Sequence, residues 1–292
     1  MDTRFLRSLI AVVETGSIAG AARREKLTAA ALSQRIQALE RELDCTLLAR
    51  GAHTVRPTEP CLALLPRARA ILRESEALRA DVAGEEPTGE LRIGAISTAL
   101  TGLLPATIRD AAARAPRLRL RLVPGSSSTL LESLIAGDLD MAILVEPPFA
   151  LPKTLASTRI RSEPLVYMTR DELPPEAIAR HASNHPFIRY EPSSFGGRLV
   201  ARYMADMGIA PPILCDLDAL EAIALLVAEG LGNALVPAWA GLPGEGVTLL
   251  APPSGAAYAR HIVVIEPSLS GRRRAADFIR ASLTQAARPA GA

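Results

Sequence analysis

The sequence is poor in aromatic residues and in cysteine, and these shortages limit the composition of the core and the kinds of cross-link or metal site that the chain can form. Aromatic side chains make up 3% of its 292 residues, so a core must rest on Leu, Ile, Val and Ala. Cys45, Cys61 and Cys215 lie far apart, and no CxxC pair or Cys/His cluster occurs. The sequence therefore predicts neither a disulfide framework nor a zinc site, and this cysteine usage fits a reducing cytoplasm.

Long apolar runs and catalytic motifs are also missing. No stretch of about 18 apolar residues is free of charge, Gly and Pro, so no membrane span is expected. The apolar stretch 9–13 runs straight into Glu14 and is too short for a signal peptide. The chain has no GxSxG, HExxH or Walker A motif, and Gly230-Leu231-Gly232 lacks a further Gly at dinucleotide-binding spacing. We therefore do not expect an enzyme.

The charge that is present is unevenly distributed. Hydrophobic residues make up 49% and charged residues 22%, which is typical of a folded globular protein, and the formal net charge is +2. Residues 1–58 hold nine basic and six acidic side chains (+3), and the remaining residues hold 24 and 25 (−1). A basic head on a near-neutral body indicates that the head binds phosphate.

Three helices are predicted in the head. Apolar residues recur with helical spacing over residues 4–15, and Gly16 ends that helix. Ser17 is a good N-cap for a short helix over residues 18–24, which is rich in Ala and Gly. Thr28 then caps a third helix that extends to about residue 42.

The third helix has one apolar face and one polar face. At about 100° per residue, Leu32, Ile36 and Leu39 fall together and must face the core. Gln34 lies opposite them. Its neighbours on the outward face and its flanks are Ala30, Gln37, Arg41, Ser33 and Arg35. A face of amides, hydroxyls and guanidinium groups suits a DNA major groove, where amides read base edges while Ser and Arg contact phosphates.

A two-stranded wing and a long helix follow. Residues 46–50 and 55–56 flank a turn at residues 51–53. Thr58 caps the long helix, which tolerates Pro60 in its first turn, whereas Pro66 predicts a bend. A seven-residue repeat forms a narrow seam along this helix, with two sets of positions: Cys61, Ala68, Ser75 and Val82, and Leu64, Ile71 and Leu78. Such a seam favours a close helix-helix dimer over packing against the chain's own head, although both remain open.

Beyond a linker at residues 84–89, strands and helices alternate. The first set consists of strands at 91–95, 118–123 and 141–145 and helices at 103–114 and 129–136. The second set consists of strands at 165–169, 187–190, 213–215, 234–237 and 260–265 and helices at 198–207, 219–229 and 272–283. This order predicts two parallel sheets with flanking helices.

Several segments together resemble the LysR-type transcriptional regulator family over nearly the whole chain. In the head they are residues 5–9 (FLRSL), 14–22 (ETGSIAGAA), 31–40 (ALSQRIQALE), 47–50 (LLAR), 56–59 (RPTE) and 64–72 (LLPRARAIL). Downstream they are Leu134, Gly137, residues 139–142 (LDMA) and 227–237 (VAEGLGNALVP). Three positions depart from the family: Ala29 and Ala30 stand where a base-reading Gln and a Pro or Ser are usual, and Cys61 stands where Gly is usual.

The resemblance implies a multidomain fold. An N-terminal, mainly α, winged helix-turn-helix (1–58) and a long linker helix for dimerisation (59–88) precede a two-lobed α/β effector domain (89–292) like that of periplasmic binding proteins. We expect lobe I at about 90–161 and 267–292 and lobe II at about 162–266, with strands 165–169 and 260–265 as the hinge. Such proteins are cytoplasmic one-component regulators that bind double-stranded DNA and form homodimers or homotetramers, without membrane, cofactor or catalysis.

The candidate DNA-contacting residues follow from the polar face and the resemblance. They are Ser17, Thr28, Ala29, Ala30, Ser33, Gln34, Arg35, Gln37, Arg50 and Arg56. The substitution by Ala29 and Ala30 removes a base-reading side chain, so it changes which target sequence we expect.

Two hydroxyl-rich turns are candidates for binding a small effector. Ser97-Thr98 and Ser126–Thr129 each follow a predicted strand and precede a helix, and open α/β sheets bind ligands at strand carboxyl ends. The ligand role is favoured for Ser97-Thr98, while Ser126–Thr129 serve equally well as N-caps only. Helix N-termini there suit an anionic metabolite. The candidate effector residues are Ser97, Thr98, Ala99, Ser126, Ser127, Ser128, Arg189, Tyr190 and Phe195, the last three being equally compatible with surface positions.

Two other functional classes stay open at this point. A cytosolic small-molecule-binding protein or an α/β enzyme would share the alternating strands and helices, but the enzyme has no motif to support it. A solute-binding protein would share the two lobes, yet it would need a secretion signal and would not need residues 1–58.

Overall fold

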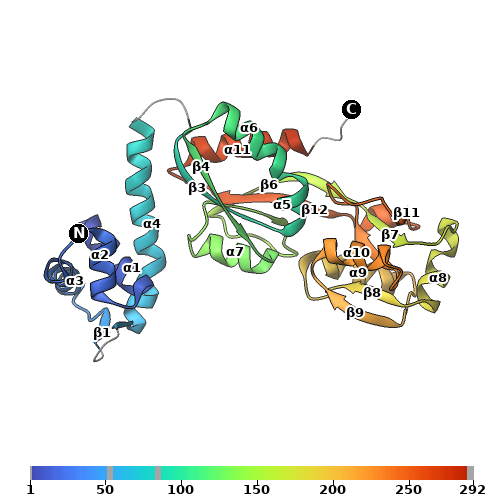
Figure 1. Cartoon of the computed structure of the whole chain (residues 1–292), viewed down its shortest axis with the longest axis horizontal. Helices are drawn as coiled ribbons and strands as arrows, with labels where there is room; N and C mark the ends of the chain where they lie inside the picture. The colour runs from blue at the N-terminus through green and yellow to red at the C-terminus, as the bar shows by residue number, and fades with distance from the viewer. Residues whose placement is uncertain (1, 51–54, 83–86, 288–292) are drawn as a thin grey trace. The chain divides into compact units, whose positions relative to one another are not determined.

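The computed structural model describes residues 2–50, 55–82 and 87–287, with only the backbone described at residues 50, 73, 74 and 76–82 (Figure 1). The chain divides into two compact units. The first holds residues 1–85 with 135–138, and the second holds the rest.

The first unit contains the predicted head and long helix. Its elements are α1 (Thr3–Thr15), α2 (Ile18–Glu25), α3 (Ala29–Leu43), the antiparallel strands β1 (Leu48–Arg50) and β2 (Val55–Pro57), and α4 (Glu59–Val82). The predicted caps form: the Ser17 and Thr28 hydroxyls accept hydrogen bonds from the backbone N–H groups of Gly20 and Ala31 at 3.3 and 3.1 Å. Gly16 ends α1 with φ 63°, a conformation that favours glycine.

The start of the long helix packs against its own unit, which corrects part of the predicted dimer seam. Cys61 and Ala68 are fully buried in one core with Leu6, Leu32 and Leu39. Only one side of α4 contacts that core, so a residue such as Ile71 stays 38% exposed. The predicted seam positions at Leu78 and Val82 lie outside the described side chains.

A five-stranded mixed sheet forms the first lobe of the second unit. Its strand order is β4 (Leu118–Pro124), β3 (Gly89–Ala95), β5 (Met141–Val145), β12 (Arg260–Pro267) and β6 (Leu155–Glu163). β3 runs parallel to β4 and β5, whereas β12 runs antiparallel to β5 and β6. α6 (Leu104–Arg114) and α11 (Arg273–Ala286) pack together on one face, and α7 (Ser127–Ile135) lies on the other (Figure 1).

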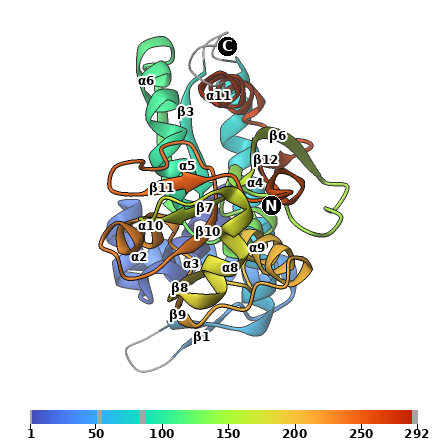
Figure 2. The ribbon, with the colours of Figure 1, turned by 90° about the vertical axis from the view of Figure 1, so that its right-hand side faces the viewer.

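A second group of strands forms the other lobe. β7 (Leu165–Thr169) pairs antiparallel with β10 (Ala234–Pro237) and β11 (Thr248–Leu250), and β8 (Phe187–Tyr190) lies parallel beside β9 (Ile213–Leu217) (Figure 2). A parallel bridge from Phe187 to Asn233 joins the two sets. The helices are α8 (Ile178–Asn184), α9 (Phe195–Asp206) and α10 (Leu220–Ala228), with short 3₁₀ turns at Pro175–Ala177 and Gly255–Tyr258.

The structure corrects the predicted sheets and hinge. Neither lobe is purely parallel, and strand 260–265 lies inside the first sheet rather than in lobe II, because Ile262 and Val264 pair with β5 and β6 on both sides. Strand 165–169 lies inside the second lobe. The chain therefore crosses between lobes at Pro164 and Ala259, next to these strands.

Several elements escaped prediction because their local patterns are weak. β6 is exposed along most of its length, so it shows no apolar alternation. α8 and β11 are short, and the turn at Ser97 continues into a helix of its own, α5 (Ser97–Gly102), before α6 begins. None of the described helices has the length and apolar character needed to cross a membrane.

Candidate functional sites

The outward face of α3 presents amide groups to solvent. Ala30, Gln34 and Gln37 are exposed, and they lie opposite the buried Leu32, Ile36 and Leu39. Because their amides project into solvent, both glutamines are placed to form paired hydrogen bonds with base edges.

Charged groups around α3 are held in place by neighbouring elements. The Glu40 carboxylate accepts hydrogen bonds from the Leu47 and Leu48 backbone N–H groups at 2.8 and 3.2 Å, which directs this negative charge toward the wing. Half-buried Arg35 donates from Nη1 to the buried Ser8 hydroxyl at 3.4 Å. This contact orients the guanidinium against α1 while leaving it other N–H donors.

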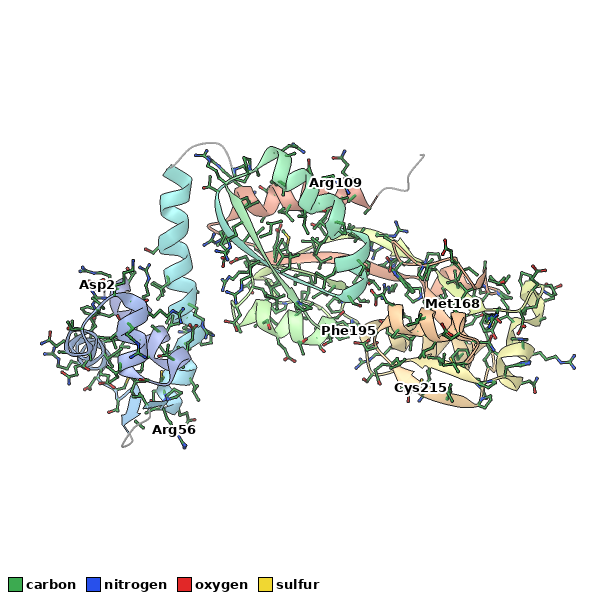
Figure 3. All side chains as sticks on the ribbon, in the orientation of Figure 1. Asp2, Arg56, Arg109, Met168, Phe195 and Cys215 are labelled. Carbon is green, nitrogen blue, oxygen red and sulfur yellow. The ribbon has the colours of Figure 1, made fainter. Side chains whose placement is uncertain are left out.

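The other predicted DNA-contacting residues surround this face. Thr28 and Ala29 are exposed at the start of α3, while Ser33 on α3 and Ser17 at the start of α2 are half-buried. Arg56 is exposed on β2 (Figure 3). The Arg50 side chain lies outside the described side chains.

A cavity of about 470 Å³ lies within the second unit and is lined from both lobes. The first lobe contributes Ile96, Ser97, Thr98, Pro124, Gly125, Ser126, Ser127, Ser128, Val145 and Arg260. The second lobe contributes Tyr190, Ser193, Ser194, Phe195, Arg198, Asp218, Ala219 and Leu220. This volume fits a small metabolite.

The cavity brings together seven of the nine predicted effector residues and leaves out Ala99 and Arg189. Ala99 is buried in the first-lobe core, because the turn of α5 directs it inward. Arg189 points away from its neighbour Tyr190, since successive side chains of a strand alternate faces, and it pairs with Asp216 on β9 at 2.6 Å. These two residues therefore lie outside the cavity lining.

The serine turn serves as both cap and cavity wall. Ser126 Oγ accepts a hydrogen bond from the Thr129 backbone N–H at 3.3 Å and lies 3.1 Å from Ser128 Oγ. Ser127 Oγ accepts from the Val145 N–H at 3.2 Å. Ser127 Oγ is an acceptor there, so its hydrogen can still be donated to a ligand, whereas one of the Ser126 and Ser128 hydroxyls donates to the other.

A buried ion pair lies at the base of the cavity. Arg260 and Glu163, each 2% exposed, meet at 2.6 Å between Nε and Oε2. Arg260 also donates to Thr98 Oγ1 at 2.9 Å and contacts the Tyr190 hydroxyl at 3.5 Å. Sequence reasoning missed this pair because its members lie 97 residues apart.

Glu221 connects the two lobes at the edge of the cavity. Its carboxylate accepts hydrogen bonds from the Ser97 hydroxyl at 3.0 Å and the Thr101 hydroxyl at 3.2 Å. Ser97 and Thr101 belong to α5 in the first lobe, while Glu221 belongs to α10 in the second. A ligand that uses the Ser97 hydroxyl as a donor must therefore compete with Glu221.

Removal from water changes the ionisation of two cavity residues. Desolvation at the cavity wall raises the pKa of Asp218, although a hydrogen bond from Ser194 and the charge of Arg260 act in the opposite direction. Burial also raises the pKa of Tyr190, so its hydroxyl stays protonated at neutral pH. Among the described residues, no cluster of three or more His, Cys, Asp or Glu side chains is arranged to hold a metal ion.

Both halves of the chain match models of one protein family. Residues 3–61 match the model described as bacterial regulatory helix-turn-helix protein, lysR family. Residues 84–287 match the model described as LysR substrate binding domain. The chain belongs to the LysR family.

Individual relatives agree with this assignment. The LysR-family chain is 33% identical over 246 residues to the HTH-type transcriptional regulator IlvR of Caulobacter vibrioides, covering 82% of this chain and 83% of IlvR. It is 29% identical over 261 residues to the HTH-type transcriptional regulator TtuA of Agrobacterium vitis, covering 86% and 85%.

Solved LysR-family structures share the fold. A full-length OxyR variant from Pseudomonas aeruginosa gives a TM-score of 0.73 at 20% identity and covers 99% of this chain and 97% of that one. CbnR complexed with its target DNA gives 0.63 at 23% identity and covers 98% and 100%.

The family assignment confirms the predicted function. The chain is a LysR-type DNA-binding transcriptional regulator with an effector-binding domain, and it is a transcription factor rather than an enzyme. The alternatives of a stand-alone binding protein or an α/β enzyme are therefore set aside.

Proposed function

We propose that this regulator reads double-stranded operator DNA with the exposed face of α3 and positions itself with flanking residues of the head. The exposed amides of Gln34 and Gln37 carry this proposal, while the Glu40 carboxylate of the same helix is bound to backbone N–H groups at the wing. We assign the head to 1–58, the linker helix to 59–88 and the effector domain to 89–292. The shared fold with CbnR, which was solved on its target DNA, supports the same mode of docking. We also propose that the protein acts in the cytoplasm, which a DNA-binding role supports.

Two substitutions in α3 are expected to affect DNA binding differently. Gln34→Ala should reduce the difference in binding free energy between the preferred base and the other bases by about 1–3 kcal/mol, because the amide pairs with one base edge. Arg35→Ala should weaken binding to all DNA sequences, because the Arg35 guanidinium is proposed to contact a phosphate. The slope of the logarithm of the binding constant against the logarithm of salt concentration should fall in magnitude by about 1. Fluorescence anisotropy with operator and scrambled duplexes at several salt concentrations measures both. Gln285→Ala, an exposed amide of α11, is the control. Unchanged binding in both α3 variants would contradict this role of the helix.

We propose that the cavity between the lobes binds a small metabolite with an anionic group and that this binding regulates DNA affinity. Hydroxyls from two helix starts converge on the cavity, which supports the assignment. A ligand that prefers one lobe arrangement shifts the population of regulator states, and a coupling of about 1–3 kcal/mol suffices.

Ser97→Leu is expected to abolish effector binding while sparing DNA binding. A bulky apolar side chain would fill the cavity edge and remove the hydroxyl that now contacts Glu221. A thermal-shift screen of carboxylates and amino acids selects the ligand, and calorimetry compares wild type, Ser97→Leu and the exposed control Ser157→Leu on β6. Equal affinity in wild type and Ser97→Leu would place the effector elsewhere.

We also propose a homodimer or homotetramer formed through the outer face of α4. Ile71 is exposed on this face, whereas Leu64, seven residues before it, is half-buried where it also packs against the core of the head. Pairing of two chains presents two copies of α3 to two half-sites.

A further inference from the structure

The effector cavity carries charged groups of both signs. Arg260 is already neutralised by Glu163 at 2.6 Å. The cavity wall also carries the Asp218 carboxylate, and Glu221 lies at its edge in contact with Ser97. Arg198 of the second lobe also lines the cavity, so an entering ligand meets cationic as well as anionic groups there.

Asp218 is the carboxylate among the lining residues of the cavity, and the residue is exposed. Its described side-chain partner is the neutral Ser194, and no ion pair among the described residues involves Asp218. Glu221, by contrast, is satisfied by two hydroxyls. Desolvation raises the pKa of Asp218, while the Ser194 hydrogen bond and the charge of Arg260 act in the opposite direction.

The first-lobe wall offers donors instead. Ser126, Ser127 and Ser128 line the cavity, and the hydrogens of these hydroxyls can turn toward a ligand oxygen. The Arg260 guanidinium lines the same cavity and has five N–H groups, more than its three described partners use. A ligand that spans the cavity thus meets donors on the first lobe and, on the second, the Asp218 carboxylate as well as the Arg198 guanidinium.

We propose that the effector is a compact zwitterion of the α-amino acid type, with its ammonium group on Asp218 and its carboxylate on the serine hydroxyls and Arg260. This inference rests on the proposed effector function of the cavity and names its ligand class. The ligand bridges the two lobes, so it favours the closed arrangement. A dicarboxylate would place a second negative charge next to Asp218. A simple amine would have no carboxylate to accept hydrogen bonds from the serine hydroxyls.

Matched probes that differ only at the amino group test this assignment on the purified full-length chain. The panel consists of the standard amino acids, the 2-hydroxy acids with the same side chains and the corresponding unsubstituted acids, for example L-valine, 2-hydroxy-3-methylbutanoate and 3-methylbutanoate. Thermal shift identifies binders and calorimetry measures their Kd. At least one amino acid should bind about tenfold or more tightly than its two analogues, because an ionic hydrogen bond is lost in both.

Asp218→Asn should raise the Kd of that amino acid about tenfold or more. It should also reduce the difference in affinity between the amino acid and the hydroxy acid. Glu229→Gln removes an exposed carboxylate of the same lobe outside the cavity lining and should change neither value. Retained operator binding and an unchanged melting temperature of the unliganded protein show that the variant is folded.

Three results would overturn the zwitterion assignment: no amino acid of the panel binds, a hydroxy acid or dicarboxylate binds more tightly than the amino acids, or Asp218→Asn leaves amino acid affinity unchanged. Failure of the ligand class is distinguishable from failure of the cavity. If Ser97→Leu abolishes binding of a hydroxy acid, the cavity is still the effector site. If no variant of the cavity affects any bound ligand, the proposed function also fails.

Discussion

Glu163→Met is expected to destabilise the effector domain by about 3–5 kcal/mol, because it leaves the Arg260 cation buried without a carboxylate. Arg260 is 2% exposed, so water cannot replace the lost partner. Arg260→Met should cost less, since Glu163 keeps Arg161 at 3.5 Å as a second cation. Urea unfolding followed by fluorescence measures both, and the single Trp239, buried in the second-lobe core, reports on this domain alone.

The double variant Glu163→Met/Arg260→Met is the control. It removes both charges at once, so most of the lost stability should return and leave a coupling energy of about 3 kcal/mol. Additive losses in the double variant would show that the two residues stabilise the domain through other contacts. A near-neutral Glu163→Met would show that solvent reaches Arg260.

Ile71→Glu is expected to dissociate the proposed assembly and to lower operator affinity about 10²- to 10⁴-fold. A carboxylate in the seam would be buried without a partner in the dimer but hydrated in the monomer. A monomer binds one half-site at a time and loses the effective concentration supplied by the second head. Light scattering measures the mass, and anisotropy with full and half operators measures affinity.

Leu62→Glu is the matched control. Leu62 is 54% exposed and lies nine residues from Ile71, about 180° around the same helix. The same change of charge on that face should leave both mass and operator affinity intact. If Ile71→Glu keeps the wild-type mass while Leu62→Glu dissociates the protein, the chains pair through the other face of α4.

Local features of the head could be predicted well from the sequence. Ser17, Gly16 and Thr28 end or begin helices through groups within four residues, so their roles do not depend on the rest of the fold. The face of α3 follows in the same way from helical spacing alone. The dimer seam was predicted less well, because the same repeat that suits a partner helix also suits the core into which Cys61 and Ala68 pack.

Some features of the cavity also follow from the local sequence, and others depend on the tertiary structure. By itself, the sequence determined which segments form helices and strands in the head and where hydroxyl-rich turns such as Ser97-Thr98 follow strands, since these features depend on neighbours along the chain. Only the tertiary structure decided that Arg260 meets Glu163 and Thr98, residues 97 and 162 positions away. Only the tertiary structure turned Tyr190 into the cavity and Arg189 away from it. The physical reason is that strand pairing and the crossings at Pro164 and Ala259 determine which distant side chains share a buried space, and no local pattern encodes that choice.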